Sequence, residues 1–467
     1  FYFFLFFFIF FYFFLFFLFF IFFYFFLLLT LFFSDYFTET YVNVIFYFRF
    51  IFFAFAIYFF LKYDFKILKK IYIFLSLTIF VVVFDGYWQY FFSENLMGFQ
   101  KYRVDRISGF FKEDLILGSF LSRLLPLLVA LMFFFKKYKF LTATNILIIS
   151  ATIILILLSG ERAAFFKTMM FLLIILLILK IRIRIKLGIV LSIIFFLSIF
   201  IFFNPVIFDR YYKQTARHLS NEHGNFLVNY LPMFNTSLKM FSNSKLIGHG
   251  PKSYRYLCND ERFVNYYPNS VKRDNTIIEL FATWKELRNF KITKFLVFEN
   301  DIIEKGDELF FYKFIGDDQE QTFFSDKEGK IDKIYRKEKY VKNTAIIEIT
   351  PQYSPKEEFF KVSACNTHPH NFYIQLLAET GLIGFIFLLI LFFNLFYIFL
   401  QNFYYNFSKK DKKLSNAEIA LIAGFFICIW PITTNGNFFN NWINLISFYP
   451  LGIFLYIQNQ KKIKNVE

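Results

Sequence analysis

Long apolar runs separated by short polar segments make up most of this 467-residue chain. A membrane-spanning helix takes about 20 predominantly apolar residues. Ten runs approach or exceed that length, the last only marginally, and they lie near 1–33, 43–61, 67–84, 115–135, 140–158, 163–180, 187–203, 373–400, 416–433 and 443–457. Hydrophobic residues form 57% of the sequence, whereas soluble domains have about 45–50%. The pattern predicts a mainly α-helical, polytopic transmembrane bundle of about ten spans.

Lysine and arginine are concentrated in every second connection between these runs. The basic residues are Lys62, Lys66, Lys69, Lys70, Lys136, Lys137, Lys139, Lys180, Arg182, Arg184, Lys186, Lys409, Lys410, Lys412, Lys413, Lys461, Lys462 and Lys464. Because cytoplasmic loops carry the excess of positive charge, this alternation predicts cytoplasmic termini and an outer segment 204–372. It also indicates that 1–33 is one long or tilted helix, or part of a longer one, and not a hairpin. The net charge of +16 therefore reflects membrane orientation, and we expect no nucleic-acid partner.

The outer segment divides into a helical part, 204–259, and a β part, 260–364. In the β part apolar and polar residues alternate, and turn signals occur at Gly306 and Gly329. This predicts a small β insert between an N-terminal membrane domain, 1–203, and a C-terminal one, 365–467. The insert resembles a barrel-sandwich hybrid of the biotinyl or lipoyl type in shape, without the modified lysine. An unrelated β insert is an equal alternative.

Two of the three cysteines, Cys258 and Cys365, bracket the β insert on the outer side. An oxidising compartment permits a disulfide between them, and two unpaired thiols are the alternative. Cys428 lies in an apolar run, where a cysteine usually serves packing. No cysteine or histidine spacing is typical of a zinc site, so we expect no metal and no cofactor.

Three polar motifs fall at predicted outer ends of spans. The first is Ser159-Gly160-Glu161-Arg162. The second, residues 241–251, ends in Gly248-His249-Gly250-Pro251. The third, residues 367–384, contains His368, His370 and Asn371 and continues as Glu379-Thr380-Gly381 into an apolar run. In this order they resemble the signature of the O-antigen ligase and O-antigen polymerase superfamily of bacterial envelope glycosyltransferases.

The resemblance implies metal-independent transfer of a glycan from a polyprenyl diphosphate at the periplasmic face of the bacterial inner membrane. The acceptor would be a lipid-A-core sugar for a ligase or the growing glycan for a polymerase, and membrane lipids surround the protein. A leaving diphosphate calls for arginine, whose planar fork binds phosphate in a bidentate manner. Arg162 is the first choice, followed by Arg210 and Arg217. His370, and after it His368, suits the acceptor hydroxyl.

Each of these residues also has a structural interpretation. Arg162 can extend to the membrane interface, the histidines can be surface residues, and Asn371 can cap the helix that follows. Gly248 and Gly250 can cradle a phosphate with their amides or form a plain turn. We expect Arg162 and His370 to face one outward-opening cavity. Protein O-oligosaccharyltransferase, transporter or flippase, and envelope scaffold remain open as alternative functions.

Overall fold

The computed structural model describes most of the chain, and the segments it describes are 18–102, 105–135, 137–178, 183–215, 225–268, 276–279, 290–315, 319–325, 328–338, 340, 345–350, 359–362, 365–407 and 414–464. Helices dominate this part. A helix at Leu18–Leu31 comes first. After it come α2 (Phe37–Ile45), η1 (Phe46–Phe48), α3 (Arg49–Tyr63), α4 (Lys66–Phe92), η2 (Gly109–Phe111), α5 (Leu117–Phe134), α6 (Lys139–Leu158), α7 (Arg162–Ile178), α8 (Ile183–Phe203), α9 (Pro205–Phe208), η3 (Asp209–Lys213), α11 (Asn225–Asn243), α12 (Tyr254–Leu257), α13 (Phe372–Phe407), α14 (Asn416–Cys428) and α15 (Asn441–Lys464).

Within the described residues, five helices are long and apolar enough to cross a membrane, namely Phe37–Tyr63, Lys66–Phe92, Leu117–Phe134, Lys139–Leu158 and Phe372–Tyr405. The chain is therefore a polytopic membrane protein by length and composition, but the prediction of about ten spans is wrong in number. Some apolar runs in the sequence include loop residues. The run 416–433, for example, is helical only to Cys428 and continues as a loop through Trp430 and Pro431.

Close contacts between small residues hold the membrane helices together. A Cβ built on Gly452 of α15 would lie 2.4 Å from the Ala54 carbonyl oxygen of α3, and one on Gly424 of α14 would lie 2.5 Å from Pro126 Cβ of α5. Lipid offers no hydrophobic driving force between helices, so association depends on such close packing. The outward surfaces of α3 and α4 remain apolar, with Phe52 and Phe74 both 66% exposed, as expected of lipid-facing positions.

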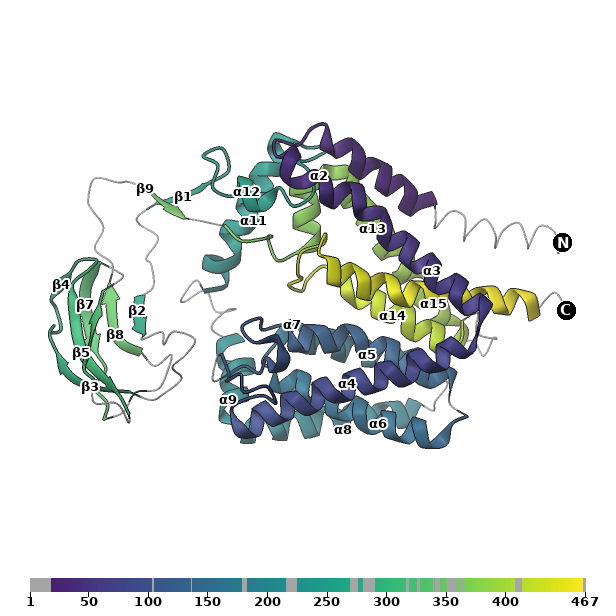
Figure 1. Cartoon of the computed structure of the whole chain (residues 1–467), viewed down its shortest axis with the longest axis horizontal. Helices are drawn as coiled ribbons and strands as arrows, with labels where there is room; N and C mark the ends of the chain where they lie inside the picture. Colours follow the sequence, from purple (N-terminus) through teal and green to yellow (C-terminus); the bar gives the residue numbers. More distant parts are fainter. Residues whose placement is uncertain are drawn as a thin grey trace.

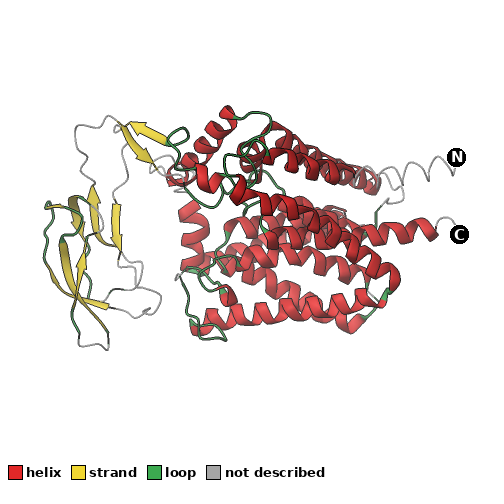
Figure 2. Cartoon of the chain, turned by 45° about the horizontal axis from the view of Figure 1, so that its top comes forward, coloured by secondary structure: helices red, strands yellow, loops and turns green. Residues whose placement is uncertain are grey.

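The β insert forms a separate module at one end of the helical bundle (Figures 1 and 2). Its strands are β1 (Asn265–Pro268), β2 (Thr276–Glu279), β3 (Phe290–Phe295), β4 (Ile302–Ile303), β5 (Glu308–Phe314), β6 (Gln321–Phe324), β7 (Gly329–Ile334), β8 (Ala345–Thr350) and β9 (Phe359–Val362). They pair in antiparallel sheets of order β2-β8-β7-β4 and β3-β5-β6, while β1 pairs with β9.

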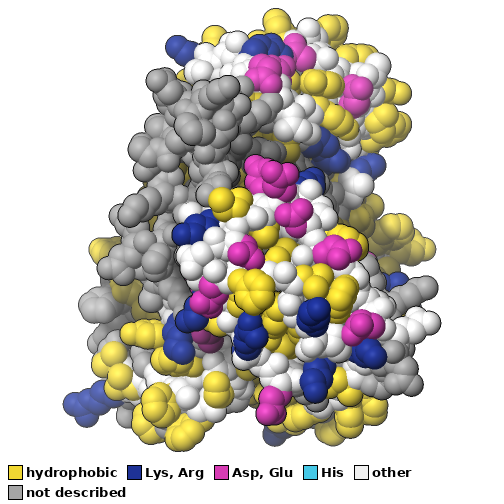
Figure 3. Space-filling view, turned by 90° about the vertical axis from the view of Figure 1, so that its left-hand side faces the viewer, with side chains coloured by type: hydrophobic (Ala, Val, Ile, Leu, Met, Phe, Trp, Pro, Cys, Tyr) yellow, Lys and Arg dark blue, Asp and Glu magenta, His cyan; other side chains and the backbone are white. Residues whose placement is uncertain are grey.

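The two larger sheets share one apolar core, to which Phe310 and Phe314 of β5 and Ile331 and Ile347 of β7 and β8 contribute. Each sheet keeps open edges among the described strands. The expectation of a barrel is therefore wrong, because the described strands pack face to face and do not close into a ring. Figure 3 shows that charged side chains of both signs lie among apolar ones on the outer face of the module, without a patch of a single sign.

The chain enters and leaves the β module at one disulfide. Cys258, after α12, is bonded to Cys365, and their Cα atoms are 5.0 Å apart. The ladder of β1 and β9 follows immediately, with Asn265 opposite Val362. The helix α15 ends at the opposite end of the bundle from the module (Figure 1).

We expect a cysteine at Phe298 to react with a membrane-impermeant maleimide added to intact spheroplasts. Phe298 lies in the β module and is 66% exposed, and the alternation of lysine-rich loops predicts that this end faces outward. The matched control is Lys62→Cys, on the lysine-rich side, which should react only after the inner membrane is permeabilised. The reverse labelling pattern would contradict the orientation.

Candidate functional site

The polar segment 366–371 enters the helical bundle at the start of α13. Asn371 caps this helix, because its Oδ1 accepts hydrogen bonds from the backbone N–H groups of Tyr373 (2.9 Å) and Ile374 (3.2 Å). Its amide Nδ2 donates to the Pro431 carbonyl oxygen at 2.7 Å. Asparagine is a preferred cap because it satisfies the free amides of the first turn. One side chain thus starts α13 and ties it to a second loop.

That second loop, residues 430–440, joins α14 to α15 and is rich in asparagine; we call it the Asn-rich loop. The Asn435 N–H donates to the His370 carbonyl oxygen at 2.8 Å. Gln375 of α13 donates to Asn437 Oδ1 at 3.0 Å and accepts from the Phe438 N–H at 2.8 Å. Buried polar groups of this kind are costly unless they are paired. The pairing fixes the histidine segment against the Asn-rich loop.

His368 is a buried structural residue in this arrangement. Its Nε2 donates to the Asn435 carbonyl oxygen at 3.1 Å, and its Nδ1 accepts from the Thr367 hydroxyl at 2.8 Å. Both ring nitrogens are therefore occupied. Burial, assisted by His370, lowers the pKa of His368 to about 4. The ring is neutral at physiological pH and is held in one tautomer.

His370 differs from its neighbour in both backbone and ring. Its φ of 57° is in the left-handed region, which a non-glycine residue adopts at a cost of about 1–3 kcal/mol. Its Nε2 accepts from the Asn366 amide at 2.9 Å, so the neutral ring carries its proton on Nδ1, which has no hydrogen-bond partner in the described part of the chain. Burial lowers the pKa of His370 below its usual value of 6.5.

Lys167 of α7, which is only 4% exposed, is connected to the histidine segment through Asn435. Its ammonium group donates to Asn435 Oδ1 and, at 3.3 Å, to the Thr434 carbonyl oxygen. Asn435 thus contacts Lys167 through its side chain and His370 through its backbone N–H. A buried amine and an imidazole are linked through one residue.

Gly248 and Gly250 lie against α13 and are not arranged as a phosphate cradle. The Gly250 N–H donates to the Glu379 carbonyl oxygen at 2.8 Å. The Glu379 carboxylate accepts from the backbone N–H groups of Lys252 (2.9 Å) and Tyr254 (3.2 Å). The backbone amides of Gly250, Lys252 and Tyr254 are thus already used within the protein. The alternative prediction, a turn, describes the segment better.

The α13 helix is interrupted where this turn contacts it. Gly381 has φ 62° and ψ −161° inside the helix, and the Leu382 N–H donates to the Lys245 carbonyl oxygen at 2.8 Å. A Cβ on Gly381 would lie 2.4 Å from the backbone carbon of Leu246, and one on Gly248 would lie 2.4 Å from that of Glu379. Only glycine allows two backbones to approach this closely with positive φ.

We therefore expect Gly248→Ala and Gly381→Ala to destabilise the protein by about 2–5 kcal/mol, from backbone strain plus overpacking. The matched control is Gly98→Ala. Gly98 also has a positive φ, of 80°, but nothing lies within 4 Å of its Cβ position. In thermal unfolding in detergent, Gly248→Ala and Gly381→Ala should lower the melting temperature clearly more than Gly98→Ala does. Equal effects at all three positions would show that the close contact is unimportant.

The predicted diphosphate ligands Arg162 and Arg210 lie together at the junction of α6, α7 and η3. The Arg162 guanidinium donates to Thr215 Oγ1 at 3.0 Å. Arg210 donates to the Gly160 carbonyl oxygen at 3.1 Å and lies 3.6 Å from Asp105. The histidines, by contrast, bond to Asn366, Thr367 and Asn435, and no contact joins Arg162 to His370. Arg217 lies outside the described residues.

The Ser159–Arg162 motif has a clear structural role at this junction. Glu161 accepts from the N–H groups of Gly118 (2.6 Å) and Ser119 (3.0 Å) in the first turn of α5, where the helix dipole favours a carboxylate. Burial raises the pKa of Glu161, and the charge of Arg106 opposes that shift. The Arg106 guanidinium in turn donates to the Ser159 carbonyl oxygen at 2.9 Å.

No family model, curated protein or solved structure matches this chain. The resemblance to the O-antigen ligase superfamily thus rests on the three motifs alone. Within the described residues, no group of three or more histidine, cysteine, aspartate or glutamate side chains has an arrangement that could hold a metal.

Sequence reasoning missed Lys167 and the Asn-rich loop. Lys167 is a single basic residue inside the apolar run 163–180, and an ionisable residue inside such a run is a signal of function or of a specific partner. The loop carries Asn435, Asn437 and Asn440 between two apolar runs. By the same alternation of basic loops, this loop falls on the side of the histidines.

Proposed function

We propose that the protein is a membrane glycosyltransferase of the O-antigen ligase type, which transfers a glycan from a polyprenyl diphosphate to a lipid-A-core sugar at the periplasmic face of the bacterial inner membrane. The observation that carries the proposal is His370. It presents a neutral imidazole on a strained backbone at the mouth of α13, and Asn435 links it to the buried amine of Lys167.

The reaction needs a base and a counter-charge. The acceptor hydroxyl oxygen attacks the anomeric carbon of the donor glycan and forms the new glycosidic bond. The bond from that carbon to the diphosphate oxygen breaks, and the polyprenyl diphosphate leaves with the electron pair. The proton of the hydroxyl passes to His370. If Nδ1 accepts this proton, the ring must first move its own proton from Nδ1 to Nε2. If Nε2 accepts it, Nε2 must first release the hydrogen bond from Asn366. A positioned base of this kind contributes about 10²–10⁴-fold to the rate.

The break in α13 bears on the transporter alternative. Transporters place broken helices and binding sites near the bilayer midplane. Here the helix beyond Gly381 continues to Phe407, a length of about 39 Å at 1.5 Å per residue, which is enough to cross the hydrocarbon core of about 30 Å. The break therefore lies at one end of the span, together with the histidines. This favours a reaction at the membrane surface over passage through it.

The proposal is tested by the lipopolysaccharide gel profile of a strain lacking the gene. A ligase predicts loss of all long chains from the lipid-A core, restored by the wild-type gene. A core that carries one repeat unit would indicate a polymerase. An unchanged lipopolysaccharide with unglycosylated envelope proteins would indicate a protein O-oligosaccharyltransferase.

A further inference from the structure

We infer that Asn366 and Tyr230 are positioning residues that hold the His370 ring in one tautomer and one orientation, and that the base of the β module places both of them. The inference rests on the proposed function only for the role of His370 as a base. It rests on the structure for the two contacts, which reach the ring from two different elements.

The orientation of the Asn366 amide is fixed by its other neighbour. Its Oδ1 accepts a hydrogen bond from the Thr367 N–H at 2.7 Å, and a backbone N–H can only donate. The amide Nδ2 therefore faces His370 and donates to Nε2 at 2.9 Å. Because the Nε2 lone pair is occupied, the proton of the neutral ring lies on Nδ1. One amide thus selects the tautomer of the base.

Tyr230 contacts the same ring from α11, outside the histidine segment. The two ring centres are 5.9 Å apart, and the ring planes are nearly perpendicular, at 89°. Aromatic rings favour this edge-to-face arrangement. Asn366 thus acts on one ring nitrogen, while Tyr230 limits rotation of the ring as a whole.

On the side of β9, the disulfide fixes the chain next to Asn366. Asn366 directly follows Cys365, which is bonded to Cys258. The strands β1 and β9, which lie between the two larger sheets and the helices α11 and α12, pair with each other close to this bond (Figure 1). The ladder and the disulfide together determine where the Asn366 amide lies.

On the side of β1, hydrogen bonds attach the ladder to α11. Asn265, the first residue of β1, is 3% exposed, and its Nδ2 donates to the Pro232 carbonyl oxygen and to Thr236 Oγ1, both at 2.8 Å. The Thr236 hydroxyl in turn donates to the Phe263 carbonyl oxygen at 3.1 Å. A satisfied buried network of this kind is rigid. Pro232 is two residues from Tyr230, so the ladder also determines where the Tyr230 ring lies.

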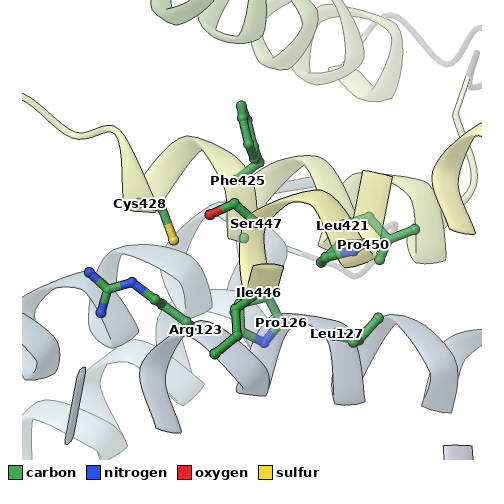
Figure 4. Close-up of a pocket in the computed structure, with 10 residues that line it drawn as sticks. Arg123, Pro126, Leu127, Leu421, Phe425, Cys428, Ile446, Ser447 and Pro450 are labelled. Atoms are coloured by element: carbon green, nitrogen blue, oxygen red, sulfur yellow. The ribbon is translucent and has the colours of Figure 1, made fainter. Parts of the chain in front are cut away.

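The interior of the bundle does not orient the His370 ring. The cavity between α5, α14 and α15 is lined by Arg123, Pro126 and Cys428, among others, and His370 is not one of its lining residues (Figure 4). Its volume of about 10 Å³ leaves room for about one water. A substrate cannot reach His370 through so small a cavity, so the ring has to be held in position at the mouth of α13.

The charge next to the His370 Nε2 atom can be changed by one substitution. Four other titratable side chains lie near His370 or are connected to it, and they are those of His368, Tyr230, Lys167 and Arg255. None of the four is a carboxylate, and burial keeps His368 neutral, with a pKa of about 4. A carboxylate at position 366 would therefore be the first negative charge beside the ring.

The test replaces Asn366 with aspartate, which keeps the shape of the side chain and the acceptor for the Thr367 N–H. The carboxylate accepts from an Nε2–H group, so the proton of the neutral ring should move to Nε2 and the pKa of His370 should rise by about 1. Both are measured by NMR of the ring nitrogens in the full-length protein in detergent, with isotope-labelled histidine. The His370 signals are those lost in His370→Gln, and in the wild type they should show the Nδ1–H tautomer.

Asn259→Asp is the matched control. Asn259 follows Cys258 as Asn366 follows Cys365, and both asparagines are exposed, but only Asn366 is hydrogen-bonded to His370 in the described part of the chain. The control should leave the tautomer and the pKa of His370 unchanged. An Nε2–H tautomer in the wild type, or an unchanged pKa in Asn366→Asp, would overturn the role of Asn366.

The pH profile of transfer gives a second readout. Burial lowers the pKa of His370 below 6.5, so the wild-type rate should fall only below that pH. In Asn366→Asp the acidic fall should move about one pH unit higher, together with the NMR value. A merely structural role would lower the rate at every pH and leave the acidic fall in place, and this result would overturn the inference.

Tyr230 is tested through its ring. Tyr230→Leu should lower kcat about 2–10-fold, the size of one aromatic pair, and leave KM unchanged, whereas Tyr230→Phe keeps the ring and should restore kcat. The matched control is Tyr256→Leu, because Tyr256 stacks on Tyr36, with ring centres 5.1 Å apart. Equal losses in Tyr230→Leu and Tyr230→Phe would overturn the role of Tyr230.

The base of the β module is tested by Asn265→Ala. This variant should lower kcat as Tyr230→Leu does, and the double variant should be no slower than Tyr230→Leu alone, because the two residues act through one contact. Additive losses would separate β1 from the site. The NMR measurement does not depend on glycan transfer. The expected tautomer and pKa in a protein that transfers no glycan would contradict the proposed function and leave the positioning, whereas transfer with the other tautomer would do the reverse.

Discussion

Replacing His370 with alanine is expected to lower glycan transfer by about 10²–10⁴-fold, the contribution of a positioned base, with little change in protein level. The side chain makes one hydrogen bond, to Asn366, and its backbone carbonyl, which holds Asn435, remains in the variant. Transfer is measured as the rate at which labelled glycan reaches the acceptor.

The matched control is His249→Gln. His249 is also buried, but its ring bonds to the Met240 carbonyl oxygen at 3.0 Å and lies 3.8 Å from Asp35, away from the histidine segment. This variant should retain transfer in the fraction that folds. If His370→Ala kept a near-normal rate, His370 would not be the base.

The pH dependence of transfer follows from the direction of the His370 shift. Burial lowers the pKa of His370 below 6.5, so the neutral form needed by a base dominates at neutral pH. Transfer should be constant near pH 7 and fall as the pH drops through a value below 6.5. A rate that rises on acidification would require a protonated group in place of this base.

The second large effect is expected from the disulfide. Cys258 and Cys365 are separated by 107 residues, and closing a loop of this length stabilises a protein by about 4–5 kcal/mol in the chain-entropy model. Cys258→Ser with Cys365→Ser, or reduction of the wild type, should lower the free energy of unfolding by this amount in chemical denaturation. The bond also adjoins Asn366, the partner of His370, so we expect transfer to fall as well.

Cys428→Ser is the control for this experiment, since Cys428 is a buried free thiol. In this variant, as in the wild type, the oxidised protein should unfold at a higher denaturant concentration than the reduced protein. An unfolding free energy that does not depend on reductant would contradict the stabilising role of the bond.

The sequence predicted the local elements well and the number of spans poorly. The apolar run from residue 67 lies in a helix that begins at Lys66, because its length is typical of a buried or membrane helix. The alternating residues of 260–364 form strands such as β5, Glu308–Phe314. Hydrophobicity alone cannot show where a run leaves the helix, as at Cys428. Nor can alternation alone decide whether the strands form a barrel, because that depends on which edges pair.

The candidate site was predictable in its location but not in its partners. Charge alternation brings 159–162, 367–371 and the Asn-rich loop to one side of the membrane. It cannot specify that Asn435 contacts both Lys167 and His370, since these residues are 268 and 65 positions from it in sequence. The sequence placed His370 ahead of His368 as a candidate base, but only the contacts with Thr367 and Asn435 show that His368 is a buried structural residue.

The central claim is that the protein transfers a glycan at the membrane surface, and its most direct test is transfer by the purified protein in liposomes. The donor is a fluorescent oligosaccharide on a polyprenyl diphosphate, the acceptor is a lipid-A-core lipid, and a metal chelator is present. The account predicts that the label moves to the acceptor with release of polyprenyl diphosphate, and that His370→Ala does not support this. Movement of the intact labelled donor across the bilayer without transfer, in both proteins, would contradict it.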